Sequence, residues 1–172
     1  MNLEMKSIKY AAFASQETNC FEAVIWKDGQ PWAHVSNEGH GGPDRFEPIY
    51  PEAQPNFYDD VKVVNDALAS SPEGIRYTAR CKKDYKMNLT FDLEAWCGER
   101  LEDHLQKQKL KRTLRNKVVF IDKGKLFQIG YNNKRKVDTL LVEHVRQKYP
   151  EAVVLNTMKP DMAFEAWQTV AD

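Results

Sequence analysis

Cysteine is scarce in this sequence of 172 residues. The chain has three cysteines, Cys20, Cys81 and Cys97, an odd number with no two close together in sequence. This argues against a disulfide framework and predicts reduced, mostly buried thiols. No pair among the cysteines and the four histidines shows the two-to-four-residue spacing of structural zinc ligands. We therefore predict no metal site.

Long apolar runs are also missing. Apolar runs such as residues 118–121 and 152–155 fall far short of the roughly 20 apolar residues that span a bilayer. Residues 1–10 are charged and lack the apolar stretch and small-residue cleavage site of a secretory signal. We expect a cytoplasmic protein without a membrane partner.

Catalytic motifs of high specificity are absent as well. The chain has no Gly-x-Ser-x-Gly nucleophile motif. Asp92 and Glu94 alternate as in some nuclease strands, but no acid-x-Lys partner strand completes a metal-dependent site. We predict no catalytic residue and no cofactor, and the sequence favours a binding protein over an enzyme.

The composition is that of a folded protein. Apolar residues make up 42% of the chain and nineteen residues are aromatic, which excludes a disordered tail. The length fits one domain with a substantial core. We predict a single α+β domain over residues 1–172, with a sub-division near residues 88–92 between a β-rich N-terminal half and a helix-rich C-terminal half as the alternative.

Strand patterns dominate the first third of the chain. Asp28-Gly29 favours a tight two-residue turn, and we predict a hairpin around it with Trp26 opposite Pro31 and Ile25 opposite Trp32. Pro31 lacks an amide proton and suits an edge strand. The predicted strands cover residues 8–13, 20–27, 30–36, 75–81, 86–91, 117–121, 125–131 and 152–155.

Apolar residues at steps of three and four predict the helices. Phe57, Val61, Val64 and Leu68 mark one amphipathic helix, with two aspartates in its first turn. The predicted helices cover residues 57–69, 92–115, 137–149 and 160–170. Together these elements predict an α+β fold with a mixed, largely antiparallel sheet and three to four helices.

Charge is strongly segregated although the net charge is zero. Residues 105–136 hold eleven Lys or Arg against the single acid Asp122, a net charge of +10, whereas the flanks carry −7 and −3. The eleven are Lys107, Lys109, Lys111, Arg112, Arg115, Lys117, Lys123, Lys125, Lys134, Arg135 and Lys136. Such a stretch gives the molecule a preferred face for phosphate or for an acidic protein surface.

Helical spacing places part of this charge on one face. Lys107, Lys111 and Arg115 repeat every four residues, and a hairpin around Lys123 would extend their surface. We predict a basic binding face formed by Lys107, Lys111, Arg112, Arg115, Lys123, Lys125, Lys134, Arg135 and Lys136. Its partner would be an acidic protein surface or a DNA or RNA backbone. The alternative is a solvated helix face next to lysines that protect a hairpin edge.

A glycine-rich loop at residues 36–45 is the second candidate site. Its three glycines would let backbone amides approach an anion, with Asn37, His40 and Arg45 as further binding residues. The loop matches neither the nucleotide-loop motif nor the dinucleotide fingerprint. The structural alternative is an irregular turn held by the side chains of Asn37 and Asp44.

About the first 45 residues resemble the opening of small uncharacterised accessory proteins of bacteriophages and bacterial mobile elements. The resemblance is carried by SQETNCFEA at residues 15–23, by Asp28-Gly29 and by VSNEGHGG at residues 35–42. Residues 152–156 are similar in character to the C-terminal portion of those proteins. No established activity comes with the resemblance, so it assigns no catalytic or binding residue.

The resemblance implies a context, the cytoplasm of a bacterial host. Phage accessory proteins of this size often occupy a host machine, including CRISPR and other defence complexes, without an active site. We therefore expect a non-enzymatic protein that binds a host protein or protein–nucleic-acid complex, as an anti-CRISPR-like inhibitor does. The alternatives are direct DNA or RNA binding by the 105–136 segment, and a small hydrolase or nuclease that uses the loop around His40.

Overall fold

The structure is a computed structural model that describes residues 1–131 and 136–170. Its contacts divide the chain into two compact units, Met1–Glu102 and Asp103–Asp172. Helix α3 (Leu93–Asn116) begins in the first unit and ends in the second. The boundary between the two units lies inside this helix, about ten residues beyond the sub-division predicted near residues 88–92. That the chain forms a single domain stays a prediction.

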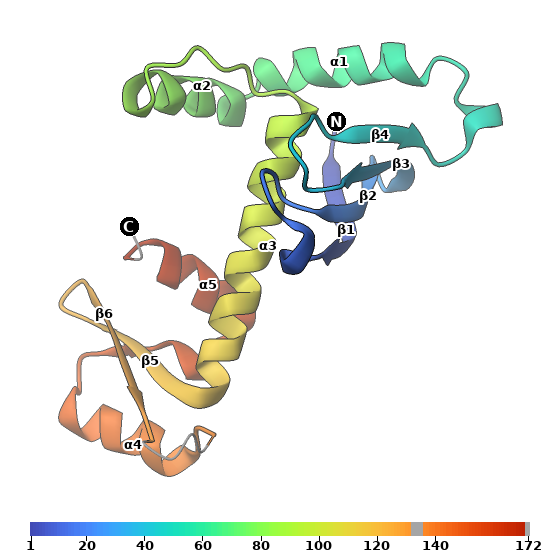
Figure 1. The fold of residues 1–172 in the computed structure, drawn as a ribbon. Helices are drawn as coiled ribbons and strands as arrows, with labels where there is room; N and C mark the ends of the chain where they lie inside the picture. The colour runs from blue at the N-terminus through green and yellow to red at the C-terminus, as the bar shows by residue number, and fades with distance from the viewer. Residues whose placement is uncertain (132–135, 171–172) are drawn as a thin grey trace. The chain divides into compact units, whose positions relative to one another are not determined.

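A four-stranded antiparallel sheet forms the first unit together with helices (Figure 1). Its strands follow one another in sequence order across the sheet. They are β1 (Leu3–Tyr10), β2 (Phe21–Lys27), β3 (Gln30–Asn37) and β4 (Arg45–Pro48). The short 3₁₀ helices η1 (Ala12–Ala14) and η2 (Pro51–Ala53) follow the two outer strands.

The predicted hairpin around Asp28-Gly29 is confirmed as β2–β3. Both turn residues have positive φ, as a tight hairpin turn requires. Trp26 lies opposite Pro31 as predicted, but a bulge then places Ile25 opposite Ala33 and not Trp32. The prediction that Pro31 lies in an edge strand is also wrong, because β3 pairs with β2 on one side and with β4 on the other. The β3–β4 pairing involves only residues 33–36 of β3, so Pro31 does not need an amide proton to pair with β4.

Three other strand predictions in the first unit are wrong. The first strand runs from Leu3 to Tyr10, not over residues 8–13. Residues 75–81 lie in helix α2 (Pro72–Asp84), because Ser71 caps its first turn by accepting the N–H of Gly74 and Pro72 occupies the first helical position. Residues 86–91 form no strand; 86–90 are exposed.

Helix α1 (Phe57–Ala69) confirms its prediction and buries Phe57, Val64 and Leu68. Trp32 of β3 packs on Phe57, with ring centroids 5.2 Å apart. The first turns of α3 add buried Leu93, Trp96, Cys97 and Leu101 to the core of this unit. Two ion pairs tie α2 to α3: Arg80 with Glu99 at 2.6 Å, and Arg100 with Glu73.

The second unit holds a three-stranded antiparallel sheet in the order β6-β5-β7. The predicted hairpin is confirmed, with Lys123-Gly124 as its positive-φ turn. The elements of this unit are β5 (Lys117–Asp122), β6 (Lys125–Gly130), α4 (Thr139–Lys148), β7 (Val153–Val154), η3 (Leu155–Thr157) and α5 (Pro160–Gln168).

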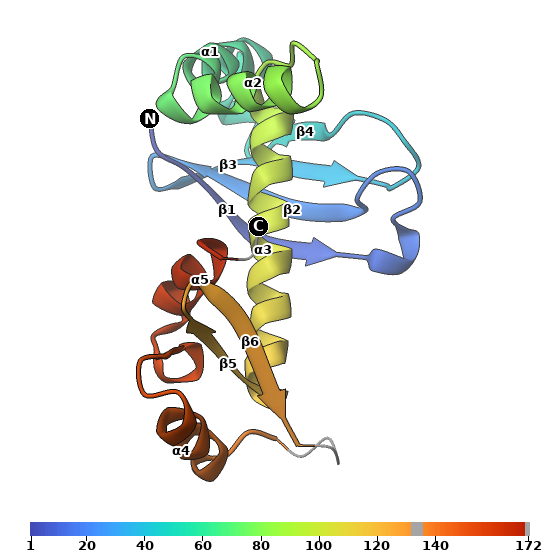
Figure 2. The ribbon, with the colours of Figure 1, turned by 90° about the vertical axis from the view of Figure 1, so that its left-hand side faces the viewer.

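Alternation along β5 separates two small cores. Val118 and Phe120 face a cluster that contains Leu141 and Val145 of α4. Val119 faces the other way, toward Leu155 and Ala163, the latter from α5. Figure 2 shows both helices beside the β5–β6 ribbon. The sheet is therefore covered by helix on both faces.

The α+β class is confirmed, with corrections to its detail. The described residues hold five α-helices, not three to four, because α2 replaces a predicted strand. They hold two separate antiparallel sheets in place of one. Within this part of the chain no helix combines the length and apolar character needed to cross a membrane.

Candidate functional site

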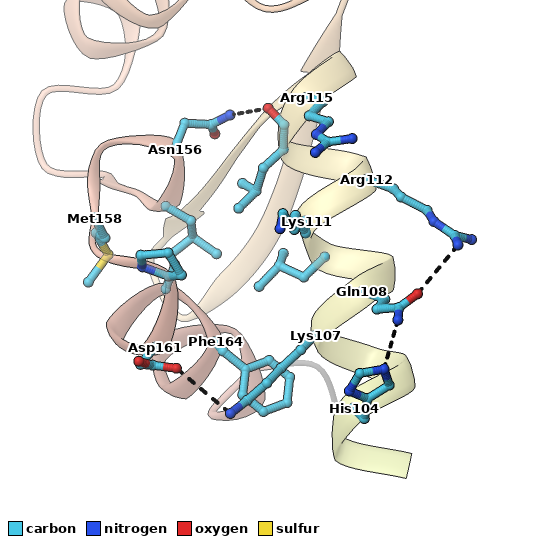
Figure 3. Close-up of a pocket in the computed structure, with 15 residues that line it drawn as sticks. His104, Lys107, Gln108, Lys111, Arg112, Arg115, Asn156, Met158, Asp161 and Phe164 are labelled. Carbon is cyan, nitrogen blue, oxygen red and sulfur yellow. Dashed lines mark hydrogen bonds and ion pairs between the residues drawn. The ribbon is translucent and has the colours of Figure 1, made fainter. Parts of the chain in front are cut away.

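The last turns of α3 and the segment from η3 to α5 enclose a hollow of about 710 Å³ in the second unit (Figure 3). Lys107, Lys111, Arg112 and Arg115 line it from α3, and Asn156, Met158, Asp161 and Phe164 line it from the other side. We call this hollow the cationic groove. It brings together four of the predicted basic residues.

The floor of the cationic groove is apolar. Leu110 of α3 is buried, as are Leu155 of η3 and Phe164 of α5. Leu114, one helical turn beyond Leu110, packs against the same core as Met158. The groove thus joins a cationic wall to an apolar base.

Within the described residues, Lys107 is the one cation of the groove that forms an ion pair. Lys107 Nζ lies 3.8 Å from Asp161 Oδ1, and it also lies 5.1 Å from the centroid of the Phe164 ring. Among the described residues, no ion pair joins Lys111, Arg112 or Arg115 to a carboxylate. Like charges one helical turn apart repel each other, so an anion bound here would relieve an unfavourable arrangement.

Arg112 is positioned through a chain of polar contacts along the helix. Its guanidinium donates to Gln108 Oε1 at 3.4 Å, and the Gln108 amide lies 2.7 Å from His104 Nε2. Figure 3 shows these three side chains along one flank of α3, while Lys107 points toward α5. The cations of the groove therefore lie on two flanks of α3, with Lys107 on the side of α5 and Arg112 on the flank that is turned away from it.

A second hollow of about 1090 Å³ adjoins the groove and shares Arg112, Arg115 and Asn156 with it. Lys136 and Arg146 also line this hollow, together with the acids Asp138 and Glu143. Asn156 stands between the two hollows. Its amide donates to the carbonyls of Leu114 and Lys117 at 2.8 and 2.9 Å, and its Oδ1 accepts the N–H of Val119 at 2.8 Å.

The remaining predicted basic residues lie elsewhere. Lys123 and Lys125 are exposed at the β5–β6 turn and line neither hollow, so the hairpin does not extend the groove. Lys134 and Arg135 lie outside the described residues. A role in binding stays a prediction for every residue of the basic face.

The glycine-rich loop uses its own amides to hold its shape. Asn37 Oδ1 accepts from the Gly39 N–H at 2.9 Å and from Thr18 Oγ1 at 2.7 Å. Asn37 Nδ2 donates to Asp44 Oδ1 at 2.9 Å, and Gly41 N–H donates to Thr18 Oγ1 at 3.3 Å. These bonds agree with a turn held by Asn37 and Asp44, and they leave the amides of Gly39 and Gly41 already engaged.

His40 and Arg45 lie at the exposed rim of a loop hollow of about 240 Å³. His40 Nδ1 is 3.3 Å from Gln16 Oε1, so an amide and not a carboxylate orients this imidazole. Arg45 forms an ion pair with Glu47 at 3.0 Å. Binding at this loop stays a prediction.

Asp44 lies behind the loop in a mostly buried position. Burial raises the pKa of its carboxyl to about 6, the Asn37 hydrogen bond acts in the opposite direction, and nearby Glu94 and Asp92 raise the value further. Burial, with the same acids nearby, also raises the pKa of the Cys97 thiol far above its ordinary value. This thiol is therefore protonated and poorly nucleophilic.

Comparison with models of protein families, with curated proteins and with solved structures finds no match for this chain. Within residues 1–131 and 136–170, no three His, Cys, Asp or Glu side chains are grouped so that they could hold a metal ion. Cys81 and Cys97 are buried and Cys20 is partly buried, which agrees with the prediction of mostly buried cysteines.

Sequence reasoning missed the second wall of the groove. Asn156, Asp161 and Phe164 meet the basic helix only in the folded chain, about 50 residues away from it in sequence. The basic spacing of α3 was a usable signal for one wall. In the sequence of the C-terminal helix, the only signals were its proline and its apolar residues. These are typical of any amphipathic helix and did not indicate that it lines a groove.

Proposed function

We propose that this chain is a non-enzymatic accessory protein that binds an acidic surface of a host protein through the cationic groove. The observation that supports this most strongly is a set of cations, Lys111, Arg112 and Arg115, that line a hollow with an apolar floor and form no ion pair with a carboxylate in the part of the chain that the structure describes. Protein interfaces combine these two chemistries, a desolvated apolar centre and charges around it.

The resemblance of the first 45 residues to phage and mobile-element proteins supplies the context of the proposal. The partner would be a component of a nucleic-acid-targeting defence complex in the bacterial cytoplasm, and binding would occupy a surface that this complex needs. Such inhibition needs no catalytic group. In this proposal the chain competes with a natural acidic or phosphate-bearing ligand of the complex.

Direct binding of DNA or RNA is the second candidate function. Lys136 and Arg146 of the adjoining hollow favour it, because they extend the positive charge beyond the groove. A phosphate backbone would gain from these contacts by releasing counterions. It would make no use of the apolar floor, which is why the acidic protein comes first.

A pull-down from bacterial lysate tests the proposal. The full chain is used as bait with and without nuclease, beside the charge reversals K111E/R115E in the groove and K82E/K83E on exposed α2 positions as a matched control. We expect a defined protein that survives nuclease, is retained by K82E/K83E and is lost with K111E/R115E. Recovery of nucleic acid alone, lost as salt rises, would contradict the proposal.

A further inference from the structure

The cations of the groove have a fixed spacing. Lys107, Lys111 and Arg115 follow one another at four-residue steps on α3, which corresponds to about 6 Å of rise per step. Beside this row lies the apolar floor with buried Leu110 and Phe164. A ligand that fits must therefore carry anions about 6 Å apart and apolar groups alongside them.

Both walls of the groove are helical. Every lining residue belongs to α3, to η3 with the adjoining Met158, or to α5. An extended peptide would find no strand edge here, and its backbone N–H and C=O groups would lie unpaired over an apolar floor. A helix pairs its own backbone groups, so it can enter such a groove without this cost.

We propose that the cationic groove receives an acidic amphipathic α-helix of the partner protein, an inference that rests on the proposed function and specifies the form of the partner's surface. Acids at positions i, i+4 and i+8 of this helix face Lys107, Lys111 and Arg115 at matching steps of about 6 Å. Apolar side chains beside them enter the hollow of about 710 Å³.

A nucleic-acid strand fits this site less well. Its phosphates could meet the lysines, but sequence-independent binding also draws on bases stacked against exposed aromatic rings. The aromatic ring in the groove, Phe164, is only 4% exposed and lies beneath Lys107. The floor of the groove can therefore pack against aliphatic side chains, but it has no exposed aromatic ring on which a base could stack.

The test is a selection of random 16-residue peptides, displayed on their encoding RNA, against the full chain, with counter-selection against K111E/R115E. We expect the enriched peptides to carry acids at four-residue spacing and apolar residues on the adjoining face. They should bind at least tenfold more weakly to K111E/R115E and equally well to K82E/K83E. Circular dichroism of both variants verifies that the fold is kept.

Other outcomes would overturn the inference of a helical ligand, and some of them would indicate a different ligand of the groove. A helical ligand would be excluded by any of three results: enriched peptides that carry acids at every second residue, enriched peptides whose acids have no apolar neighbours, or no enrichment that depends on the groove. A random DNA and RNA pool that enriches in the same groove-dependent way would indicate nucleic acid, and groove-dependent dimers of the chain in sedimentation would indicate a second copy. If charge alone is selected while the pull-down still captures an acidic protein, the helix fails and the proposed function stands.

Discussion

Asp44 links stability to pH at the scale of a single residue. Its pKa is about 6 in the folded chain, above its ordinary value of 3.8, because the carboxyl is mostly buried. The folded state therefore holds this proton more tightly than the unfolded state between pH 4 and 6. By linkage, the free energy of unfolding falls as pH rises through this window and is lowest above it.

The variant Asp44→Asn should remove this penalty. Asn keeps an oxygen that can accept from Asn37, which donates to Asp44 at 2.9 Å. We expect the free energy of unfolding at pH 7 to rise by about 1 kcal/mol, a value discounted because the carboxyl is partly exposed to solvent. Urea denaturation at pH 7 and at pH 3.5 measures it, and the gain should vanish at the lower pH.

Asp122→Asn, with the same change of charge, is the control and should change the free energy by less than about 0.5 kcal/mol. Asp122 ends β5 beside the exposed turn of the hairpin. An Asp44→Asn variant that is no more stable at pH 7, or equally stabilised at pH 3.5, would show that burial does not hold the proton on Asp44.

Helix α2 depends on its cap at the scale of the element. Ser71 Oγ accepts the N–H of Gly74 at 3.0 Å and donates to the carbonyl of Leu68 at 2.6 Å, which turns the chain sharply between α1 and α2. Residues 75–81 contain Ile75 and Tyr77, whose β-propensity favours a strand. The cap and the following proline outweigh this preference.

Ser71→Ala should therefore lower the free energy of unfolding by about 1 kcal/mol, the usual effect of losing a helix N-cap. Thermal denaturation followed by circular dichroism measures the change. Ser70→Ala is the matched control, because Ser70 is the exposed neighbouring residue, and it should alter stability by less than about 0.5 kcal/mol. Equal effects of the two substitutions would contradict a capping role.

Asn156 fixes the geometry of the groove. Its three hydrogen bonds connect η3 to the end of α3 and to β5. Asn156→Ala leaves the Val119 N–H and two carbonyls without this partner, and we expect a loss of about 2–3 kcal/mol in the free energy of unfolding by urea. Asn116→Ala, which removes one exposed bond to Arg112, should cost less than about 1 kcal/mol. A similar loss in both variants would contradict the account of Asn156.

Sequence reasoning predicted those elements whose determinants are local. The Asp28-Gly29 hairpin, α1 and the capped start of α3, where Asp92 accepts the N–H of Ala95, are all encoded within a few residues. The bulge that shifts Ile25 opposite Ala33 was not predicted; it leaves Trp32 without a partner in β2, and the ring of Trp32 packs on Phe57 of α1. The second wall of the groove was missed because it forms only by tertiary contact.

Charge segregation is the leading feature at the scale of the whole molecule. A chain of zero net charge concentrates +10 in residues 105–136, and the structure places four of these cations around one groove. In our proposal this groove is the binding face, and the zero net charge spares the chain the nonspecific attraction of a uniformly basic protein. Its contribution to binding depends on ionic strength, because exposed charges are screened over about 8–10 Å at physiological salt.

The salt dependence of binding separates the two candidate functions. If the groove neutralised three to four phosphates, affinity would fall roughly 40–150-fold between 50 and 200 mM salt, at a slope of about 0.9 per phosphate. For an acidic protein partner we expect less than about a tenfold loss, since the contacts with the apolar floor persist. Fluorescence anisotropy of the captured partner at both salt concentrations measures this, and a loss above about 40-fold would favour nucleic acid.

The most direct test of the central claim is an NMR titration of the isotope-labelled full chain with the captured partner or the best selected peptide. The account predicts that amide shifts change at residues 107–115 of α3 and at residues 155–164 on the opposite wall, and that K111E/R115E removes them. Changes confined to the glycine-rich loop at residues 36–45, or to α2, would contradict the assignment of the cationic groove as the binding site.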